Sequence, residues 1–208
     1  MKGLRTRNMF VDVARKLFAK NGLDSTTMND ISDESGLSRR SIYTYFKNKE
    51  EIYWAVVQSE LDRLSEKMTK VAKMDMEPDK KLVRLIFSHL ESVKETVCRN
   101  GNLRAEFFRD VWRVESVRKN FDRNEILIFR KVMNEGVDSG YFDIQNVKLL
   151  SVITHYCVKG CEVPYIYGRI VVNSPEDLYP YVHRLVHKAL AIDQFDFTAL
   201  RRKTPYAY

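Results

Sequence analysis

The residues with the most readable chemistry lie between positions 38 and 46, where hydrogen-bond donors crowd one short segment. Its polar members are Arg39, Arg40, Ser41, Tyr43, Thr44 and Tyr45. Guanidinium groups bind phosphates and the acceptor edge of guanine, and a helix in the DNA major groove presents its first turn to the bases. On a helix, these donors face away from the apolar Ile42 and Phe46. The segment is therefore typical of a DNA-recognition helix.

Capping residues predict the elements that must hold this helix in place. Thr27 is suited to cap a preceding helix, with Asp30 three residues later to accept from its backbone N–H. Gly36 can adopt the left-handed conformation that ends that helix. Ser38 can cap the next helix. Residues 27 to 49 are thus expected to form a helix-turn-helix.

The charge balance of the chain agrees with a polyanionic partner. Among 208 residues the formal net charge is +7, and the sequence pI is about 9.2. Residues 1–50 hold ten Lys and Arg against six Asp and Glu, a difference of +4 within less than a quarter of the chain. A basic balance alone is weak evidence, but basic charge beside a recognition helix favours nucleic-acid binding.

The cysteines and histidines do not predict a cofactor or a metal. Cys98, Cys157 and Cys161 are an odd number without framework spacing, which favours a reducing cytoplasm. Cys157 and Cys161 share one helix face, as do His183 and His187, but a structural zinc site needs four ligands. No apolar run is long enough for a membrane span or a signal peptide, so we expect a soluble cytoplasmic protein.

The apolar periodicity is helical almost throughout, and it predicts an all-α fold of about nine helices. The first helix should bury Met9 and end at Asn21-Gly22, and another should begin at Pro78. Later helices are expected near Leu103–Val114, Phe121–Val137, Asn146–Tyr167 (with Pro164 kinking it or ending it early) and from Ser174 to about Ile192. We divide the chain into a DNA-binding domain (1–47), a helical effector-binding and dimerisation domain (48–192) and a weakly ordered tail (193–208).

Residues 5–57 resemble the DNA-binding domain of the tetracycline-repressor (TetR) family. The resemblance lies in the tracts FVDVARKLFAKNG, STTMNDISDESGLS and SIYTYFKNKEEIYWAVV. It implies a homodimer with an all-α ligand-binding domain of roughly six helices, released from operator DNA by a small molecule. Arg40 departs from the family, because many relatives carry a small residue there. The implied DNA-binding residues are Thr27, Met28, Ser38, Arg39, Arg40, Ser41, Tyr43, Thr44, Tyr45 and Lys49.

An effector pocket is harder to predict, because pocket-lining and core residues share the same helical spacing. A ligand site is typically an apolar cavity with a few convergent polar groups. The candidate lining residues are His89, Phe107, Phe108, Trp112, Phe121, His155, Tyr156 and Tyr165. The same residues would also make a plain core, and the sequence leaves both interpretations open.

Two functions therefore remain. In the first, a homodimeric repressor places two recognition helices in successive major grooves, about 34–36 Å apart. The resemblance to the family implies a dimer surface on the eighth and last helices, and the apolar stretches Leu149–Val158 and Leu178–Leu190 support it. In the second, the C-terminal domain binds a protein partner and has no ligand pocket, which would leave a large exposed apolar patch. No phosphate loop, nucleophile elbow or three-ligand metal spacing indicates an enzyme.

Overall fold

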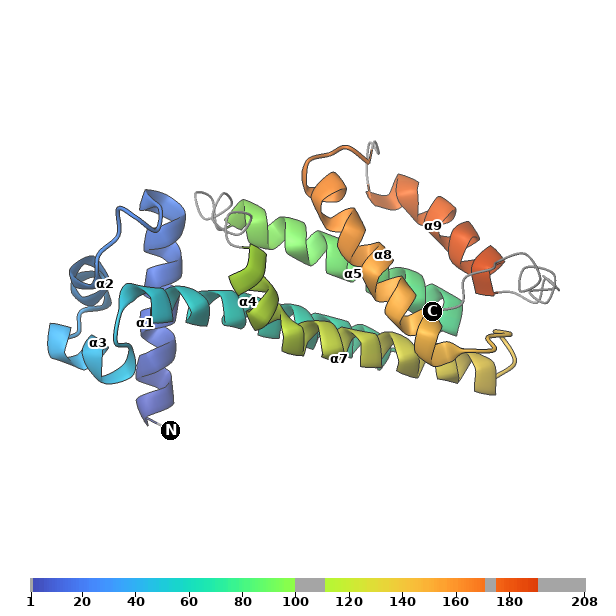
Figure 1. The fold of residues 1–208 in the computed structure, drawn as a ribbon, viewed down its shortest axis with the longest axis horizontal. Helices are drawn as coiled ribbons and strands as arrows, with labels where there is room; N and C mark the ends of the chain where they lie inside the picture. Colours follow the sequence, from blue (N-terminus) through green and yellow to red (C-terminus); the bar gives the residue numbers. More distant parts are fainter. Residues whose placement is uncertain (1, 100–110, 171–174, 191–208) are drawn as a thin grey trace, which may run out of the picture.

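The computed structural model of the chain describes residues 2–99, 111–170 and 175–190, and these residues form helices and no strand. Three helices cluster at one end of an elongated molecule (Figure 1): α1 (Lys2–Asn21), α2 (Met28–Ser35) and α3 (Arg39–Tyr45). The other end is a helical bundle of α4 (Lys49–Ala72), α5 (Pro78–Arg99), α7 (Val111–Asp138), α8 (Val147–Ile166) and α9 (Pro175–Leu190). The predicted all-α architecture is confirmed.

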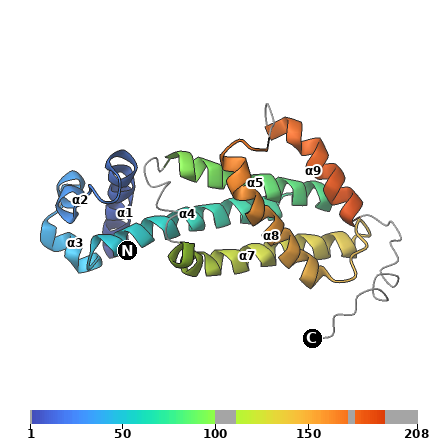
Figure 2. The ribbon, with the colours of Figure 1, turned by 45° about the horizontal axis from the view of Figure 1, so that its top comes forward.

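Two hydrophobic cores lie in these two parts, and α4 contributes to both. Phe10, Phe18 and Ile42 are fully buried in the N-terminal core, which also takes in the first turns of α4. Met68, further along α4, is fully buried in the second core beside Phe129 of α7. A helix of 24 residues is about 36 Å long, enough to reach from one core to the other. Figure 2 shows α4 running between the two parts.

The predicted helix start at Pro78 is confirmed, and the start of α4 is held by capping contacts. α5 begins at Pro78, in the first turn where a missing N–H costs no hydrogen bond. At the start of α4, the Asn48 side chain accepts from Glu51 N at 2.9 Å. The Glu51 carboxylate in turn accepts from Lys47 N at 2.7 Å, one residue further back than in the usual capping box.

The prediction of two helices between Leu103 and Val137 is wrong in its second boundary. α7 already begins at Val111 and runs without interruption to Asp138. The polar stretch before Phe121 is compatible with an exposed helix face, and no Pro or Gly interrupts the sequence until Gly136. Gly136 is required there, because a Cβ on it would lie 2.0 Å from the Phe142 ring. Residues 103–110 lie outside the described part.

One smaller difference concerns burial, while the later helix boundaries lie close to the predicted ones. Met9 is 38% exposed, and its neighbour Val11 is buried in its place. α8 continues through Pro164 to Ile166, so this proline falls in the last turn. α9 begins at Pro175, and its description ends at Leu190, so the predicted tail lies outside the described residues. Among the described helices, none is long and apolar enough to cross a membrane.

Candidate nucleic-acid interface and buried polar cluster

The helix-turn-helix is held by local hydrogen bonds at each helix start. Thr27 N donates to Asp30 Oδ2 at 2.8 Å, while Asp30 N donates to the Thr27 hydroxyl at 3.2 Å. These contacts complete the predicted capping box of α2. The hydrogen bond with the Thr27 backbone lowers the pKa of Asp30, and the hydrogen bond with the Thr27 side chain lowers it further. The carboxylate form of Asp30 is therefore the one that stabilises this helix start.

The turn between α2 and α3 depends on a left-handed glycine and a buried serine. Gly36 has φ of 68°, a conformation that side chains rarely adopt, and it ends α2. The Ser32 hydroxyl, 2% exposed, donates to Leu37 O at 2.7 Å across the turn. Ser41 N then donates to the Ser38 hydroxyl at 3.2 Å, which caps α3. The two helices are thus fixed at their junction.

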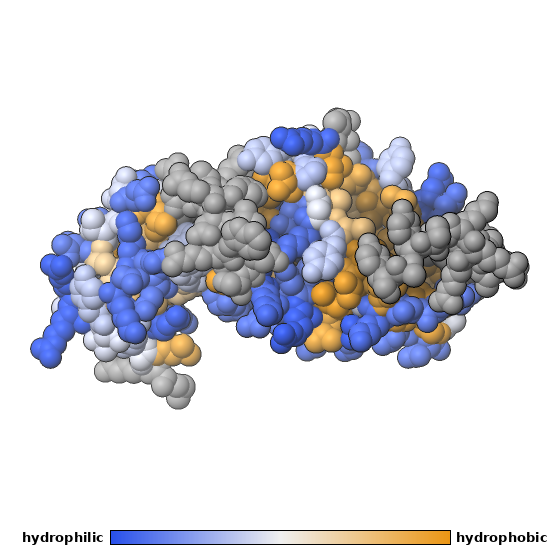
Figure 3. Space-filling view, in the orientation of Figure 1, coloured by the Kyte–Doolittle hydropathy of each residue, from blue (hydrophilic) through white to orange (hydrophobic). Residues whose placement is uncertain are grey.

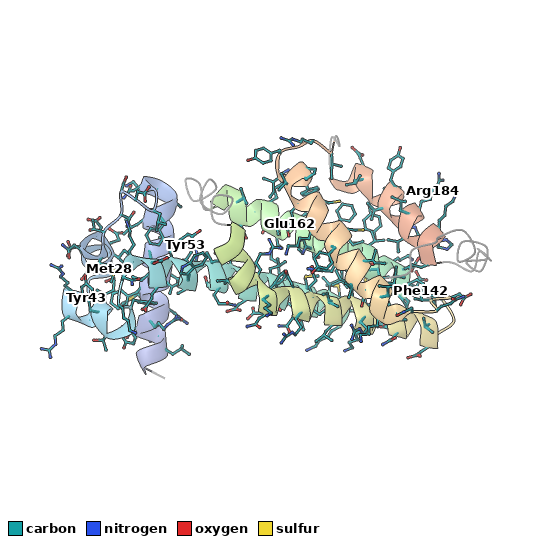
Figure 4. All side chains as sticks on the ribbon, viewed as in Figure 1. Met28, Tyr43, Tyr53, Phe142, Glu162 and Arg184 are labelled. Atoms are coloured by element: carbon teal, nitrogen blue, oxygen red, sulfur yellow. The ribbon has the colours of Figure 1, made fainter. Side chains whose placement is uncertain are left out.

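One face of α3 is buried, and the opposite face carries donors that water can reach. Ile42 and the following Phe46 are 0% and 2% exposed, so they anchor α3 in the N-terminal core. Arg39, Arg40 and Thr44 are exposed. Tyr43 is 44% exposed, and the Arg39 guanidinium lies 5.9 Å from its ring centroid. Figure 4 shows Tyr43 at the outer end of the N-terminal part.

Some predicted contact residues have a structural role of their own. Met28 is buried, and Tyr45 packs its ring 6.0 Å from that of Phe10. The Lys49 ammonium donates to the carbonyl of Leu23 at 2.6 Å and to that of Asp24 at 3.2 Å. Lys49 therefore ties the start of α4 to the beginning of the loop after α1. A third proton remains on its ammonium, so DNA contact stays a prediction for this residue.

A buried ion pair joins the N-terminal part to the bundle. Arg15 Nε of α1 lies 2.8 Å from Glu60 Oε1 of α4, and these side chains are 13% and 3% exposed. The other Glu60 oxygen accepts a hydrogen bond of 3.4 Å from the Thr96 hydroxyl of α5. One buried carboxylate therefore touches a helix of each core.

The second core contains a chain of charged side chains that spans α5, α7 and α8. Glu125 bridges two histidines, with His89 Nδ1 at 2.5 Å from one oxygen and His155 Nδ1 at 2.5 Å from the other. His89 Nε2 lies 2.9 Å from Glu162, and the Glu162 carboxylate also accepts hydrogen bonds from both terminal nitrogens of Arg118. Figure 4 labels Glu162 on α8, where α8 faces α5. We call these five residues, with Asp122 and Lys159, the polar cluster.

The electrostatics of the polar cluster favour charged forms. Burial strongly opposes the His89 imidazolium, but the hydrogen bonds to Glu125 and Glu162 outweigh it and raise the pKa of His89 to about 9. Burial likewise opposes the Glu162 carboxylate, yet His89 and Arg118 lower its pKa to about 2. The pKa of Glu125 is lowered by both histidines in spite of burial. Each acid is thus matched by a neighbouring cation.

This arrangement is a hydrogen-bonded chain and does not form a metal shell. His89 gives its two ring nitrogens to different carboxylates, so neither nitrogen points at a centre shared by other ligands. Within the described part of the chain, no group of three or more His, Cys, Asp or Glu could hold a metal ion. Cys157 and Cys161 are free thiols, and His183 bonds Asp79 of α5 at 2.9 Å.

The structure gathers some of the predicted effector residues and separates others. His89, Phe121, His155 and Tyr165 are all buried in the α5–α7–α8 region. Tyr156 is 59% exposed, although its ring contacts that of His155 at 4.9 Å. Phe107 and Phe108 lie outside the described residues, as does the side chain of Trp112.

The sequence analysis missed the charged members of the polar cluster. Glu125 lies four residues from both Phe121 and Phe129, and Glu162 lies four residues after Val158. Both acids therefore interrupt apolar faces of their helices. That interruption was the available signal, because an acid at a buried helix position needs a partner.

Exposed apolar side chains form a stripe on the other face of α8. The stripe, which we call the α8 stripe, consists of Leu149, Ile153, Tyr156, Val163 and Tyr167, each at least 37% exposed. On α9, Tyr181 and Leu185 are each 70% exposed. Hydrophobic surface follows α8 in the space-filling view (Figure 3). A patch of this kind commonly marks a protein interface.

Comparison with known proteins agrees with this geometry. Residues 10–56 match the family model described as bacterial regulatory proteins, tetR family. The chain is 27% identical over 153 residues to the transcriptional regulator YfiR of Bacillus subtilis, covering 70% of this chain and 71% of that one. It is 25% identical over 142 residues to the transcriptional repressor KstR2 of Mycobacterium tuberculosis, covering 65% and 68%.

The fold of nearly the whole chain is also shared with a solved structure. FadR of Bacillus subtilis, crystallised with stearoyl-CoA, superposes with a TM-score of 0.63 at 18% identity, covering 86% of this chain and 96% of that one. The fold and the exposed recognition helix define a helix-turn-helix DNA-binding regulator. Residues 10–56 belong to the DNA-binding domain of the TetR family, and over about two thirds of its length the chain is similar to known transcriptional regulators.

Proposed function

We propose that the chain is a homodimeric repressor that binds a pseudo-palindromic operator through α3 and is released by a small-molecule effector. The observation that carries this proposal is the exposed donor face of a short helix that is capped at Ser38 and anchored by Ile42. The relative KstR2 is described as a repressor, which supports the same direction of regulation.

Arg39 and Arg40 are the residues proposed to read the operator. Both are exposed in the first turn of α3, the turn that a recognition helix presents to base edges. An arginine bidentate to guanine discriminates by about 1–3 kcal/mol, whereas a phosphate contact adds affinity without sequence preference. The cation–π contact with Tyr43 orients Arg39. Thr27, Ser38, Thr44 and Lys49 are proposed to contact the flanking DNA backbone.

The α8 stripe, with Tyr181 and Leu185 of α9, is proposed as the dimer interface. Burying these side chains against a second copy would form a four-helix bundle across a two-fold axis. Each large apolar side chain removed from water contributes about 1.5–3 kcal/mol before the cost of association. Such an interface would also set the distance between the two α3 helices.

Effector release needs a route from the bundle to α3, and the Glu60 carboxylate offers one. Its two oxygens contact Arg15 of α1 and Thr96 of α5. A ligand that binds better to a state with the wrong α3 spacing lowers operator affinity by its differential binding free energy. The fold it shares with FadR, which was crystallised with stearoyl-CoA, supports a small molecule as the effector.

Operator binding is tested with the intergenic DNA beside the chain's own gene in a gel-shift titration. The double variant Arg39→Ala, Arg40→Ala should lose at least 30-fold in affinity, because two contacts of about 1–3 kcal/mol each are removed. Arg84→Ala, an exposed arginine on α5, is the matched control and should bind normally. Unchanged affinity and sequence preference in the double variant would refute the assignment of α3.

The dimer is tested by sedimentation. Ile153→Glu places a charge in the α8 stripe and should convert the dimer to a monomer at micromolar concentration. Lys148→Glu, an exposed position on the same helix outside the stripe, should remain dimeric. A dimer that survives Ile153→Glu would move the interface elsewhere.

A protein-binding adaptor is the second candidate, and the exposed α8 stripe is the observation that favours it. The grooves of about 670 and 660 Å³ lie on the surface, along α7 and between α5 and α9, while the polar cluster occupies the middle of the bundle. A chain that is monomeric by sedimentation yet binds DNA would favour this function over the first.

A further inference from the structure

Three buried polar atoms around Asp122 have no hydrogen-bond partner among the described residues. They are Arg118 Nε, Asp122 Oδ1 and His155 Nε2. Arg118 Nε lies 3.7 Å from Asp122 Oδ1, and His155 Nε2 lies 3.8 Å from Asp122 Oδ2. Both distances exceed a hydrogen bond, but each pair is close enough for an oxygen atom to bridge it. We call this place the Asp122 gap.

The atoms that surround the Asp122 gap specify the kind of oxygen it accepts. Arg118 Nε–H can only donate, and the Asp122 carboxylate can only accept. His155 gives Nδ1 to Glu125, so its Nε2 faces the gap as a donor or an acceptor according to protonation. A hydroxyl can accept from Arg118 Nε–H and donate its one proton to Asp122. Water, with a second proton, can also donate to His155 Nε2 when that nitrogen is an acceptor.

The charges that flank the Asp122 gap exclude a charged guest. The Arg118 guanidinium lies on one side and the Asp122 carboxylate on the other. An added carboxylate would therefore meet Asp122, and an added ammonium group would meet Arg118, which is strongly unfavourable at a buried site. The oxygen at the gap must therefore belong to a neutral molecule.

The position of the gap suits a ligand with a ring-shaped apolar body. Arg118 and Asp122 are each 14% exposed, whereas His155 is fully buried, so the gap lies at the outer end of the polar cluster. Phe121 precedes Asp122 and is buried with its ring 6.0 Å from that of His89, and the Tyr156 ring lies 4.9 Å from that of His155.

We propose that the Asp122 gap binds the hydroxyl of a neutral alcohol or phenol, and that a water molecule occupies the same place when no such ligand is bound. This inference rests on the proposed function, because it names the polar end of the effector. Asp122 accepts the hydroxyl proton, and Arg118 donates to the hydroxyl oxygen. Water and the ligand both present a hydroxyl oxygen to these residues, and the ligand hydroxyl displaces the water.

The test compares two probes that differ only in the hydroxyl, 4-ethylphenol and ethylbenzene, titrated calorimetrically into the full chain. A buried polar site left unsatisfied by the hydrocarbon should favour the phenol at least tenfold, about 1.4 kcal/mol. Asp122→Ala should reduce that ratio below threefold. Asp138→Ala, at the exposed end of α7, should keep it.

A crystal structure without ligand supplies the second measurement, which requires no variant. One water oxygen within about 3.2 Å of Asp122 and Arg118 Nε is expected, and 4-ethylphenol should replace it. Equal affinities, binding of neither probe, a retained tenfold ratio in Asp122→Ala or a direct Asp122–His155 bond without water would each overturn the inference.

The outcome is separable from that of operator binding. Asp122→Ala should still bind the operator in the gel shift, since the gap lies in the bundle and not on α3. Loss of the phenol preference with normal DNA binding leaves the DNA-binding function standing. A wild-type chain that binds no operator refutes the proposed function whatever the phenol does.

Discussion

Replacing Arg15 with methionine should destabilise the whole chain, because it removes the guanidinium that neutralises a buried carboxylate. Arg15 Nε lies 2.8 Å from Glu60 Oε1, and the Glu60 side chain is only 3% exposed. Arg15 also donates to Asp12 at 2.7 Å and to Ser59 at 2.8 Å. Methionine keeps much of the apolar stem of arginine, so the change concerns charge and hydrogen bonding more than packing.

The magnitude follows from the burial of the two partners. Removing one member of a buried ion pair costs about 3–5 kcal/mol. Arg15 is 13% exposed, so water screens part of this interaction, and we expect about 2–3 kcal/mol. For a chain of this size each kcal/mol lowers Tm by about 2–4 °C, which gives a decrease of about 4–12 °C. Circular dichroism at 222 nm during heating measures it.

A double-variant cycle separates the charge effect from general damage. Arg15→Met with Glu60→Met removes both charges and should be more stable than Arg15→Met alone, because no carboxylate is left buried. Arg63→Met, at an exposed position of α4, is the control and should change Tm by less than about 2 °C. A double variant as unstable as the sum of its single changes would refute the reasoning.

Three further predictions concern separate parts of the fold. The pKa of His89 is raised from 6.5 to about 9, so the stabilisation from its charged form is complete below pH 6.5 and is lost as pH rises through 9. The free energy of unfolding should therefore fall by up to about 3 kcal/mol across this range. His89→Gln should abolish this dependence of the free energy of unfolding on pH, measured by urea titrations. Gly136→Ala should cost about 1–3 kcal/mol because its Cβ would lie 2.0 Å from the Phe142 ring, and adding Phe142→Leu should recover part of the loss in Tm. Lys49→Met should lower Tm, because the carbonyls of Leu23 and Asp24 lose their hydrogen bonds. If Lys49 also contacts a phosphate, the slope of the logarithm of operator affinity against the logarithm of salt concentration should decrease in magnitude by about 0.9. An unchanged slope with a lowered Tm would leave Lys49 a structural role only.

The helix-turn-helix was predictable from the sequence because its determinants are local. The capping bonds of Thr27 and Ser38 join residues three positions apart. The turn at Gly36 requires a left-handed residue at one position. Contacts of this range leave a pattern in neighbouring letters, and the same letters carry the resemblance to the family. The exposed donor face of α3 follows once Ile42 is assigned to the core.

The polar cluster and the ion pair between the N-terminal part and the bundle depend on the tertiary structure. His89 and Glu162 are 73 positions apart, and Arg15 and Glu60 are separated by more than two helices of sequence. An acid on an apolar helix face shows that a partner is needed but does not show which residue it is. That choice depends on the packing of α5, α7 and α8, which sequence periodicity cannot specify. The residues of the recognition helix can therefore be predicted from the sequence alone. The residues proposed to sense an effector can be identified only from the packing of three helices that lie far apart in the sequence.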